Sequence, residues 1–449
     1  MRPTSARGPE VASRVGIALG TAILVCFVTG LSSHWIQHPP SWFWWPAHPV
    51  WLYRVTQGTH VIAGVAAIPL LLVKLWAVYP RLFRRPIIGS PLRMLERGSI
   101  ALLVGATIFQ LSTGLLNIAQ YYPWKFFFPT AHYAMAYVAV GALAVHLAVK
   151  LPVIRDALQR PLTDPDVESS TECTESVEAL AKTGIQQQAV TRTETRSQVG
   201  SPAEVECFGR PSTQTKTGAT SETGAEFARS PAESSARADT GTPPQARPET
   251  GPHISRRAVL TGASLAAVAA GSAVAGQTVP FLRWAAVLAP RSGHGPQGVP
   301  VNRSAAAAGV GDRARDAGYR LTVTVGDRQR QFTRDELLSL PQTRASLPIA
   351  CVEGWSAGAD WSGVRLLDLL AAVGNYPGGD VRFRSLEQTG IYGSSVLPQR
   401  HVVDASTLVA LTINGETLDL DHGYPCRLIA PNRPGVLQTK WLSDIEVLS

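Results

Sequence analysis

The sequence predicts a multi-domain protein with an all-α transmembrane four-helix bundle, a fifth membrane helix and a C-terminal α+β domain. Three observations predict this division. Long uncharged apolar windows occur within residues 15–151, a polar stretch with few aromatic residues follows at 161–253, and short strand-like and helix-like patterns close the chain of 449 residues. Only 16% of the residues are charged and 45% are apolar, which excludes a small disulfide scaffold, a collagen-like fibre and a wholly disordered protein.

Residues 1–14 form a short N-terminal segment, and four apolar windows follow it in residues 15–151. Each window lacks Lys, Arg, Asp and Glu, and each is long enough, or nearly so, for a hydrocarbon layer that takes roughly 20 apolar residues. The windows are 15–31, 55–73, 98–120 and 130–149. Helices buried in a large soluble core are the alternative, but four such windows in one stretch favour a bundle in a lipid bilayer.

Basic residues near the windows predict the orientation of the bundle. Six lie between the second and third windows and three follow the fourth, whereas the loops at 32–57 and 121–129 carry one each. Because loops rich in Lys and Arg stay on the cytoplasmic side, we expect the N-terminus and the 74–97 loop there, and the Trp-rich segment 42–51 outside. Membrane flanks also account for much of the net charge of +8, so no nucleic-acid partner is implied.

Residues 161–253 are rich in Ser, Thr, Glu, Pro, Gly and Ala and carry Phe208 and Phe227 as their only aromatic residues. Such a segment buries too little apolar surface to offset chain entropy, which predicts a disordered cytoplasmic linker. Residues 255–289 then open with Ser255-Arg256-Arg257 before an uncharged Ala-rich window. This pattern is typical of a twin-arginine signal or of a plain fifth membrane helix, and both interpretations place the following domain on the outer side of the membrane.

The C-terminal domain at 300–449 shows alternating short elements. Strands are predicted at 319–325, 347–350, 381–383, 408–413 and 426–430. A capped helix is predicted at 333–338 and a second helix at 363–370. The domain has no Rossmann glycine fingerprint and no P-loop.

Cys351 follows one of these strands and lies at a strand-to-loop edge. A buried structural cysteine and a disulfide with Cys426 are the ordinary interpretations of such a residue. Zinc is disfavoured because no second cysteine or histidine stands at ligand spacing.

Four ordered motifs favour a different interpretation. They are CVEGW at 351–355 with WSGVRL at 361–366, IYGSS at 391–395, DHGYPCRL at 421–428, and PNRPGVL at 431–437 leading into QTKWL at 438–442. In this order they resemble the sulfite oxidase family of molybdenum–molybdopterin enzymes, over about residues 300–449. The resemblance implies a sulfite oxidase-like molybdopterin-binding domain with Cys351 as molybdenum ligand and Tyr392 on the substrate side.

The resemblance also implies a set of cofactor-binding residues. Soft thiolate suits molybdenum, and cationic and hydroxyl donors suit the pterin phosphate. The implied cofactor-binding residues are Asn302, Ser385, His422, Arg427, Gln438, Thr439 and Lys440. The chain departs from sulfite oxidases by lacking a cytochrome b5-like domain, and Trp355-Ser356 stand where those enzymes carry arginines, which leaves room for the branch that includes methionine-sulfoxide reductases.

Three histidines lie in the apolar windows. His60 and His132 are expected at the same outer depth, where they would ligate one b-type haem. His146 follows His132 by 14 residues, a rise of roughly 21 Å on nearly one helix face, but Lys74 takes the matching position in the second window. Histidines that form hydrogen bonds within the bundle are the alternative, although ionisable residues within membranes are commonly functional.

The predicted function is two-electron oxygen-atom transfer on a small S- or N-centred substrate at the outer face. Electrons would pass through haem b to or from the quinone pool or a redox partner protein. The alternative is a membrane-anchored binding or sensor module with a molybdopterin-type fold and no activity. A transporter is disfavoured because the windows lack paired carboxylates and broken helices.

Overall fold

The computed structural model describes residues 5–82, 90–123, 126–160, 254–288, 295–388, 390 and 392–448. The helices and the C-terminal domain belong to one compact unit formed by residues 1–162 and 254–449. The predicted linker at 161–253, and the cysteines within it, lie outside the described residues.

Five helices confirm the apolar part of the predicted fold class. They are α1 (Pro9–Gln37), α2 (Leu52–Leu82), α3 (Pro91–Ile118), α4 (Phe128–Gln159) and α6 (Arg256–Ala275). Each contains a stretch that is long and apolar enough to cross a membrane. A helix satisfies its own backbone hydrogen bonds, which is why uncharged windows of this length fold this way in lipid.

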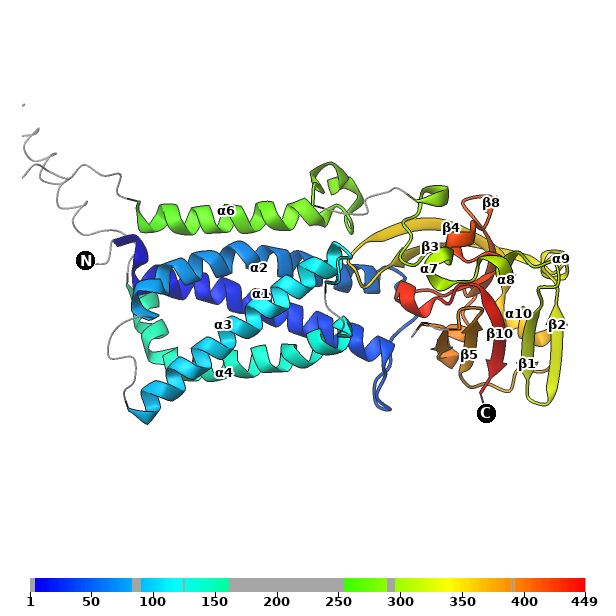
Figure 1. Ribbon diagram of the computed structural model, residues 1–449, viewed down its shortest axis with the longest axis horizontal. Coiled ribbons are helices and arrows are strands. Elements are labelled where there is room, and N and C mark those ends of the chain that lie inside the picture. Colours follow the sequence, from blue (N-terminus) through cyan, green and yellow to red (C-terminus); the bar gives the residue numbers. More distant parts are fainter. Residues whose placement is uncertain are drawn as a thin grey trace, which may run out of the picture. The chain divides into compact units, whose positions relative to one another are not determined.

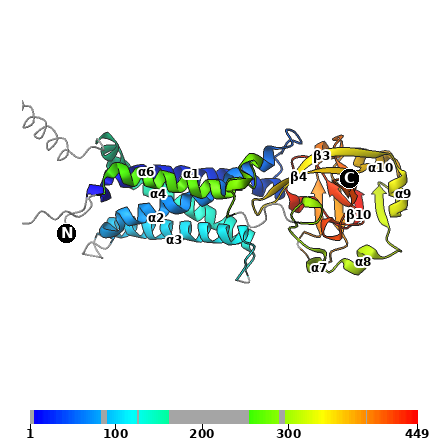
Figure 2. The same ribbon diagram turned by 90° about the horizontal axis from the view of Figure 1, so that it is seen from above.

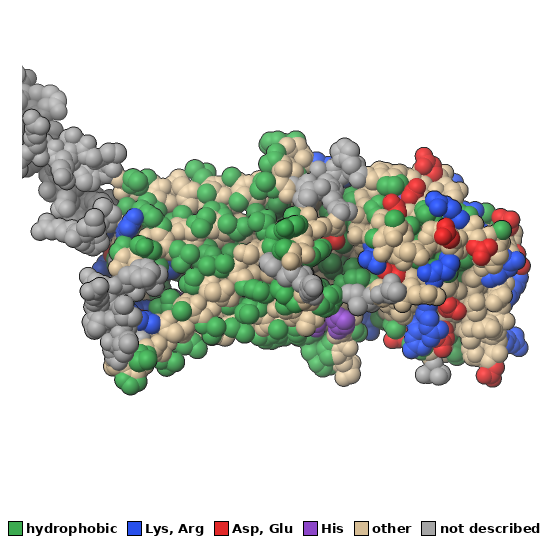
Figure 3. Space-filling model, viewed as in Figure 1, with side chains coloured by type: hydrophobic (Ala, Val, Ile, Leu, Met, Phe, Trp, Pro, Cys, Tyr) green, Lys and Arg blue, Asp and Glu red, His purple; other side chains and the backbone are tan. Residues whose placement is uncertain are grey.

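The helices pack side by side, with α2 in contact with α1, α3 and α6, and α4 in contact with α1 and α3. Figures 1 and 2 show α6 running along the α1–α2 pair. Apolar side chains cover the visible face of the helices, whereas acidic and basic side chains gather over the C-terminal domain (Figure 3). Ser255 caps α6 by accepting a hydrogen bond from the Ala258 N–H, so the two arginines lie in the first turn of a helix.

Two five-stranded sheets form the C-terminal domain. The first has the order β2-β1-β10-β5-β6 and the second the path β3-β4-β7-β8, with β9 paired to β7. The strands of the first sheet are β1 (Leu321–Val325), β2 (Arg328–Phe332), β5 (Val381–Ser385), β6 (Ser394–Leu397) and β10 (Leu442–Val447). Those of the second are β3 (Gln342–Ala350), β4 (Ser356–Arg365), β7 (Leu408–Ile413), β8 (Glu416–Thr417) and β9 (Arg427–Ile429).

Short helices connect the strands. They are α7 (Ala305–Ala308), α8 (Gly311–Arg315), α9 (Arg334–Ser339), α10 (Leu366–Ala371) and α11 (Gln399–Val402), with the 3-10 turns η1 (Ser5–Arg7), η2 (Pro280–Ala285), η3 (Pro296–Gly298), η4 (Leu420–His422) and η5 (Gly435–Leu437). The predicted capped helix is confirmed, because Thr333 and Glu336 form a reciprocal capping box at the start of α9. The core between the sheets includes Leu321, Phe383 and Leu442.

The predicted helix at 363–370 is wrong in its first turn. Residues 363–365 continue β4, and the helix α10 begins at Leu366. Gly363 pairs with Ala410 of β7, and a Cβ at this glycine would collide with the Val409 carbonyl oxygen. The pairing with a strand more than 40 residues away therefore overrides the local helical pattern.

Candidate active site and haem pocket

Cys351 begins a tight loop that joins β3 to β4 at residues 351–355, called here the cysteine loop. The Cys351 N–H donates to the Trp355 carbonyl at 2.9 Å, and the Gly354 N–H donates to the Cys351 carbonyl at 3.1 Å. The thiol side chain is 1% exposed. Burial, and then the charge of Glu353, raises the pKa of Cys351 well above its ordinary value, so the thiol stays neutral unless a cation binds beside it.

The disulfide interpretation of Cys351 is wrong, because Cys351 and Cys426 are both free. Cys426 lies in the core between the sheets, where the Tyr319 hydroxyl is 3.2 Å from its sulfur. Cys351 lies in a separate cluster with Trp355 and Trp361. The Cys351 sulfur is therefore available for another bond.

Tyr392 lies in the turn before β6 and is half-buried. Burial raises the pKa of its hydroxyl, and the nearby Cys351 and Glu353 raise it further. Tyr392 and Val352, the neighbour of Cys351 in the chain, line the same cavity. Its hydroxyl remains protonated at neutral pH and can donate a hydrogen bond.

Six of the predicted cofactor-binding residues form one connected network, called here the basic cradle. Its members are Ser385, His422, Arg427, Gln438, Thr439 and Lys440. Arg427 joins two segments, since Nη1 donates to the His422 carbonyl at 3.0 Å and Nη2 to the Gln438 carbonyl at 3.1 Å. Ser385 Oγ donates to the Lys440 carbonyl at 2.9 Å, and the Thr439 hydroxyl lies 2.7 Å from the Ser395 hydroxyl.

A glycine brings the two cations of the cradle together. Gly423 ends η4 with φ 106°, in the left-handed region that favours glycine. A Cβ at this position would lie 3.1 Å from the Cβ atoms of both Arg427 and Lys440. The absence of a side chain therefore allows the η4 turn, β9 and the 438–441 segment to meet closely.

The ring of His422 is oriented by a hydrogen bond to the protein backbone. Its Nε2 is 2.7 Å from the Pro296 carbonyl oxygen, which accepts hydrogen bonds only. Burial lowers the pKa of His422 to about 4, so the ring is neutral at pH 7 and carries one N–H. That hydrogen points to Pro296, and Nδ1 is left as an acceptor.

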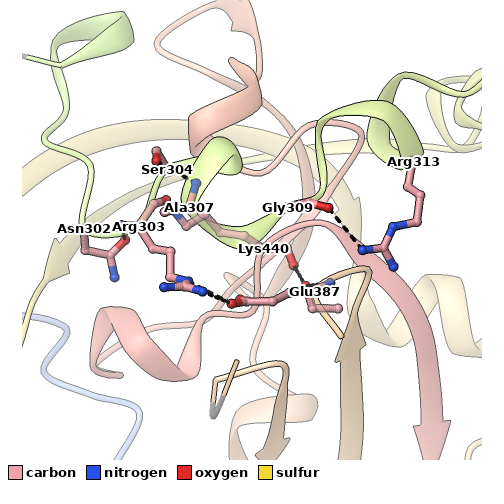
Figure 4. Close-up of polar contacts among 9 residues, drawn as sticks. Asn302, Arg303, Ser304, Ala307, Gly309, Arg313, Glu387 and Lys440 are labelled. Carbon is pink, nitrogen blue, oxygen red and sulfur yellow. Dashed lines mark hydrogen bonds and ion pairs between the residues drawn. The ribbon is translucent and has the colours of Figure 1, made fainter. Parts of the chain in front are cut away.

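Asn302 lies at the edge of the cradle, where its side chain accepts a hydrogen bond from the Arg303 N–H at 2.9 Å. Figure 4 shows Arg303 and Glu387 pointing toward each other, with Lys440 beside them. Arg303 Nε donates to Glu387 Oε1 at 2.8 Å, and Lys440 Nζ donates to the Arg303 carbonyl at 2.6 Å and the Asp421 carbonyl at 2.8 Å. The sequence analysis missed Arg303 and the buried Glu387, because an ion pair between distant segments leaves no local pattern.

Arg433 is a further buried cation that the sequence analysis missed. It is 5% exposed, its Nη2 donates to the Val396 carbonyl at 3.1 Å, and its Nε has no partner among the described residues. Burial lowers its pKa to about 10, so it is charged at pH 7. Its position directly before Pro434-Gly435, next to the predicted cofactor-binding segment, was the sequence feature that could have identified it.

The charges of the cradle fit an anionic group. Burial lowers the pKa of Arg427 to about 9, and burial with the charge of Arg427 lowers that of Lys440 to about 7. Both side chains donate to backbone carbonyls, and the buried Arg427 Nε has no partner in the described part of the chain. A buried donor without a partner is costly, and a phosphate would satisfy it.

The bundle brings His60 of α2 and His132 of α4 close together, with their ring planes inclined at 66°. Their ring centroids are 6.3 Å apart. Two imidazoles that share one metal ion through bonds of about 2 Å have ring centres roughly 6 Å apart. Both histidines line a mainly apolar cavity that also includes Gly30 and Gly114. Cβ atoms at Gly30 and Gly114 would lie 2.9 Å from the His60 ring and 3.8 Å from the His132 ring.

Hydrogen bonds orient both histidine rings. His60 Nδ1 lies 2.9 Å from the Cys26 carbonyl oxygen, so Nδ1 carries the proton and Nε2 keeps a lone pair. Thr113 donates its hydroxyl hydrogen to the Phe109 carbonyl at 2.6 Å, and its oxygen therefore accepts from His132 Nδ1 at 3.1 Å. Partners of this kind are typical of metal-binding histidines.

His146 is not brought together with the other two histidines. It lies on α4, 14 residues after His132, and does not line the cavity that contains His60 and His132. Among the described residues, no group of three or more His, Cys, Asp or Glu side chains could hold a metal ion. His34 and His38 also lie close together, with ring centroids 5.0 Å apart, but both belong to the end of one helix, α1. His60 and His132 are a close pair contributed by two different helices.

Comparisons with known proteins agree with the geometry of the C-terminal domain. The family model of the oxidoreductase molybdopterin binding domain matches residues 308–449. Sulfite oxidase of Arabidopsis thaliana is 29% identical over 171 residues, covering 31% of this chain and 43% of that protein. A putative protein-methionine-sulfoxide reductase subunit, YedZ1 of Azospira oryzae, is 32% identical over 133 residues, covering 29% of this chain and 49% of that protein.

Among solved structures, the sulfane dehydrogenase SoxCD from Paracoccus pantotrophus matches with 25% identity and a TM-score of 0.26, over 29% of this chain and 38% of that chain. The chain spans less than half the length of these relatives. Residues 308–449 therefore form a sulfite oxidase-like molybdopterin-binding oxidoreductase domain, which follows a set of apolar, membrane-type helices.

Proposed function

We propose that the protein is a membrane-anchored oxidoreductase that transfers an oxygen atom to or from a small S- or N-centred substrate. The observation that carries this proposal is the connection of a buried free thiol, Cys351, to a cradle of buried cations. Ala350, the residue before Cys351, forms a β-bridge with Pro434, which leads into the 438–441 segment of the cradle. One site therefore offers a soft ligand for a metal and donors for a phosphate.

A molybdenum ion held by a pterin dithiolene supplies two-electron oxygen-atom transfer when it is bound. Cys351 would provide the protein's thiolate ligand, because sulfur suits molybdenum. Arg427, Lys440 and Thr439 would hold the phosphate, and the neutral His422 would accept a hydrogen bond. Tyr392 keeps its proton at neutral pH, so it would donate to an oxygen of the substrate.

The helices would hold a b-type haem between His60 and His132. Three observations support this assignment. They are the ring spacing of 6.3 Å, the hydrogen bonds of the two Nδ1 atoms, and the space left beside the rings by Gly30 and Gly114. The haem would exchange single electrons with the quinone pool or a redox partner. Basic loops on the opposite side and Arg256-Arg257 in the first turn of α6 support an outer location for the C-terminal domain.

Metal analysis and an absorption spectrum of one purified sample test the proposal. We expect one molybdenum and one low-spin haem per chain, with turnover of sulfite, a sulfoxide or an N-oxide. Cys351→Ser is expected to abolish turnover while the haem spectrum is unchanged. His60→Ala and His132→Ala are each expected to remove that spectrum and leave molybdenum in place.

The control is His146→Ala, which is expected to retain both the haem and the molybdenum. A Cys351→Ser protein with full turnover would favour the alternative in which the domain is a binding or sensor module. Wild-type protein that contains neither group would refute the proposal.

A further inference from the structure

The cysteine loop is attached to the helix that carries His60. Gln57 lies on α2, three residues before His60, and its Nε2 donates to the Val352 carbonyl at 2.9 Å. Val352 is the residue after Cys351. The Gln57 side chain is 6% exposed, so this hydrogen bond is shielded from water and contributes more than an exposed one.

The same loop also packs against α2 one turn further along. Gly354 has φ 97°, and a Cβ at this glycine would lie 2.6 Å from Val61 Cγ2. Val61 is the neighbour of His60 in the sequence. Glycine therefore serves two purposes here, since it permits the left-handed turn and the close approach of the loop to the helix.

Ser356, the first residue of β4 and the neighbour of the cysteine loop, is held by the segment after α6. The Ser356 N–H and hydroxyl donate to the Gln277 backbone carbonyl at 3.2 and 3.0 Å. Gln277 is as buried as Gln57, with 6% exposure. The loop thus contacts α2 at Val352 and Gly354, and the residue that follows it, Ser356, is bonded to the segment after α6.

The cavity that contains the two histidines reaches the cysteine loop and the substrate-side tyrosine. Its lining includes Gln57, His60, His132, Val352 and Tyr392. A group held by the two histidines would therefore share one enclosure with residues that adjoin Cys351. Gln57 is the side chain in this lining that forms a hydrogen bond with the cysteine loop.

We propose that Gln57 is a positioning residue for electron transfer, which couples the His60–His132 pair to Cys351 through its hydrogen bond with Val352. This inference rests on the proposed function, because it requires haem between the histidines and a metal on Cys351. Each transfer oxidises the haem iron by one electron and reduces the metal by one electron. No bond forms or breaks in this single-electron step, and two such transfers supply one two-electron reaction. In the reductive direction a quinol would supply both electrons and release its two hydroxyl protons on becoming a quinone, and reduction of the substrate would take up two protons and release its oxygen atom as water.

Gln57→Leu tests the inference, because leucine has a similar size and cannot donate to Val352. The matched control is Gln277→Leu, which is equally buried and keeps the backbone carbonyl that binds Ser356. The first measurement is amide hydrogen exchange at residues 351–356 in the full chain produced without molybdenum cofactor. We expect exchange at least tenfold faster in Gln57→Leu and no change in Gln277→Leu.

The second measurement follows electron transfer directly in the fully loaded chain. A flash-photoreduced flavin gives one electron to the haem, and the haem absorbance then reports its reoxidation by the metal. We expect this reoxidation to be about tenfold or more slower in Gln57→Leu, with an unchanged haem spectrum and molybdenum content. Gln277→Leu is expected to match the wild type. If Gln57→Leu loses haem, Gln57→Asn, whose amide is one methylene too short to reach Val352, takes its place.

The outcomes separate this inference from the proposed function. Reoxidation within twofold of wild type in a Gln57 variant that holds both groups would overturn the role of Gln57 and leave the proposed function intact. Unchanged amide exchange at 351–356 would also overturn it. A wild-type chain without haem or without molybdenum would overturn both.

Discussion

Gly423→Ala is expected to damage the basic cradle by two separable effects. Gly423 has φ 106°, and an L-residue in left-handed backbone costs about 1–2 kcal/mol. The added Cβ would also lie 3.1 Å from the Cβ atoms of Arg427 and Lys440, so these backbones must move by a few tenths of an ångström. Overpacking of this kind costs about 1 kcal/mol or more. The expected loss is therefore about 2–3 kcal/mol.

Gly415→Ala isolates the backbone effect. Gly415 has φ 85°, and a Cβ at this glycine would meet no atom within 4 Å. We therefore expect Gly415→Ala to cost about 1–2 kcal/mol. In a domain of this size 1 kcal/mol corresponds to a shift of about 2–4 °C in the unfolding temperature.

The assay is thermal unfolding of the purified chain together with its molybdenum and pterin content. We expect Gly423→Ala to unfold at a lower temperature than Gly415→Ala and to lose most of its cofactor, because the displaced cations no longer meet at the phosphate. Gly415→Ala is expected to keep its cofactor. Equal cofactor content and equal unfolding temperatures in the two variants would refute the assignment of this turn to the cradle.

Three further predictions follow from single side chains. His401 is fully buried, and neither ring nitrogen has a partner among the described residues. Burial lowers its pKa to about 3, so the unfolded chain binds a proton below pH 6.5 that the folded chain does not, and stability falls as the pH is lowered. His401→Leu should therefore lessen the loss of stability between pH 7.5 and pH 5 by about 2 kcal/mol, and an unchanged pH profile in thermal unfolding would contradict this. Lys440→Met should lower the molybdenum cofactor content at least tenfold, as measured by metal analysis. The control is Arg382→Met, which removes a partly exposed ion pair with Glu446 and should leave the cofactor content unchanged. Thr113→Val removes the hydrogen-bond acceptor for His132 Nδ1 and should weaken haem binding by about 10–100-fold, as measured in a haem titration. Wild-type haem affinity in this variant would show that the Thr113 hydroxyl does not orient the His132 ring.

Local patterns in the sequence were sufficient for most of the elements. The apolar windows predicted α1, α2, α3, α4 and α6 because a long uncharged segment has few folds other than a helix in lipid. The strand β7 and the capped helix α9 follow from alternation and from the Thr333–Glu336 capping pair, which act between neighbours in the chain. Ordered motifs also indicated the molybdopterin-binding domain, since each motif is short and continuous.

Tertiary structure decided what depends on contacts between distant residues. The 363–370 segment looks helical by itself, but pairing with β7 keeps its first residues in a strand. Cys351 had three interpretations in the sequence, and only its location in a different cluster from Cys426 removed the disulfide.

The attachment of the bundle to the cysteine loop was also invisible in the sequence. Gln57 is an ordinary polar residue near a helix start, and Gly354 is an ordinary loop glycine. Gln57 donates a hydrogen bond to Val352, and Gly354 packs against Val61. In each pair the two residues are about 300 residues apart along the chain. Sequence periodicity reports which face of an element is apolar, but hydrogen bonds and close approaches between elements depend on how the whole chain packs.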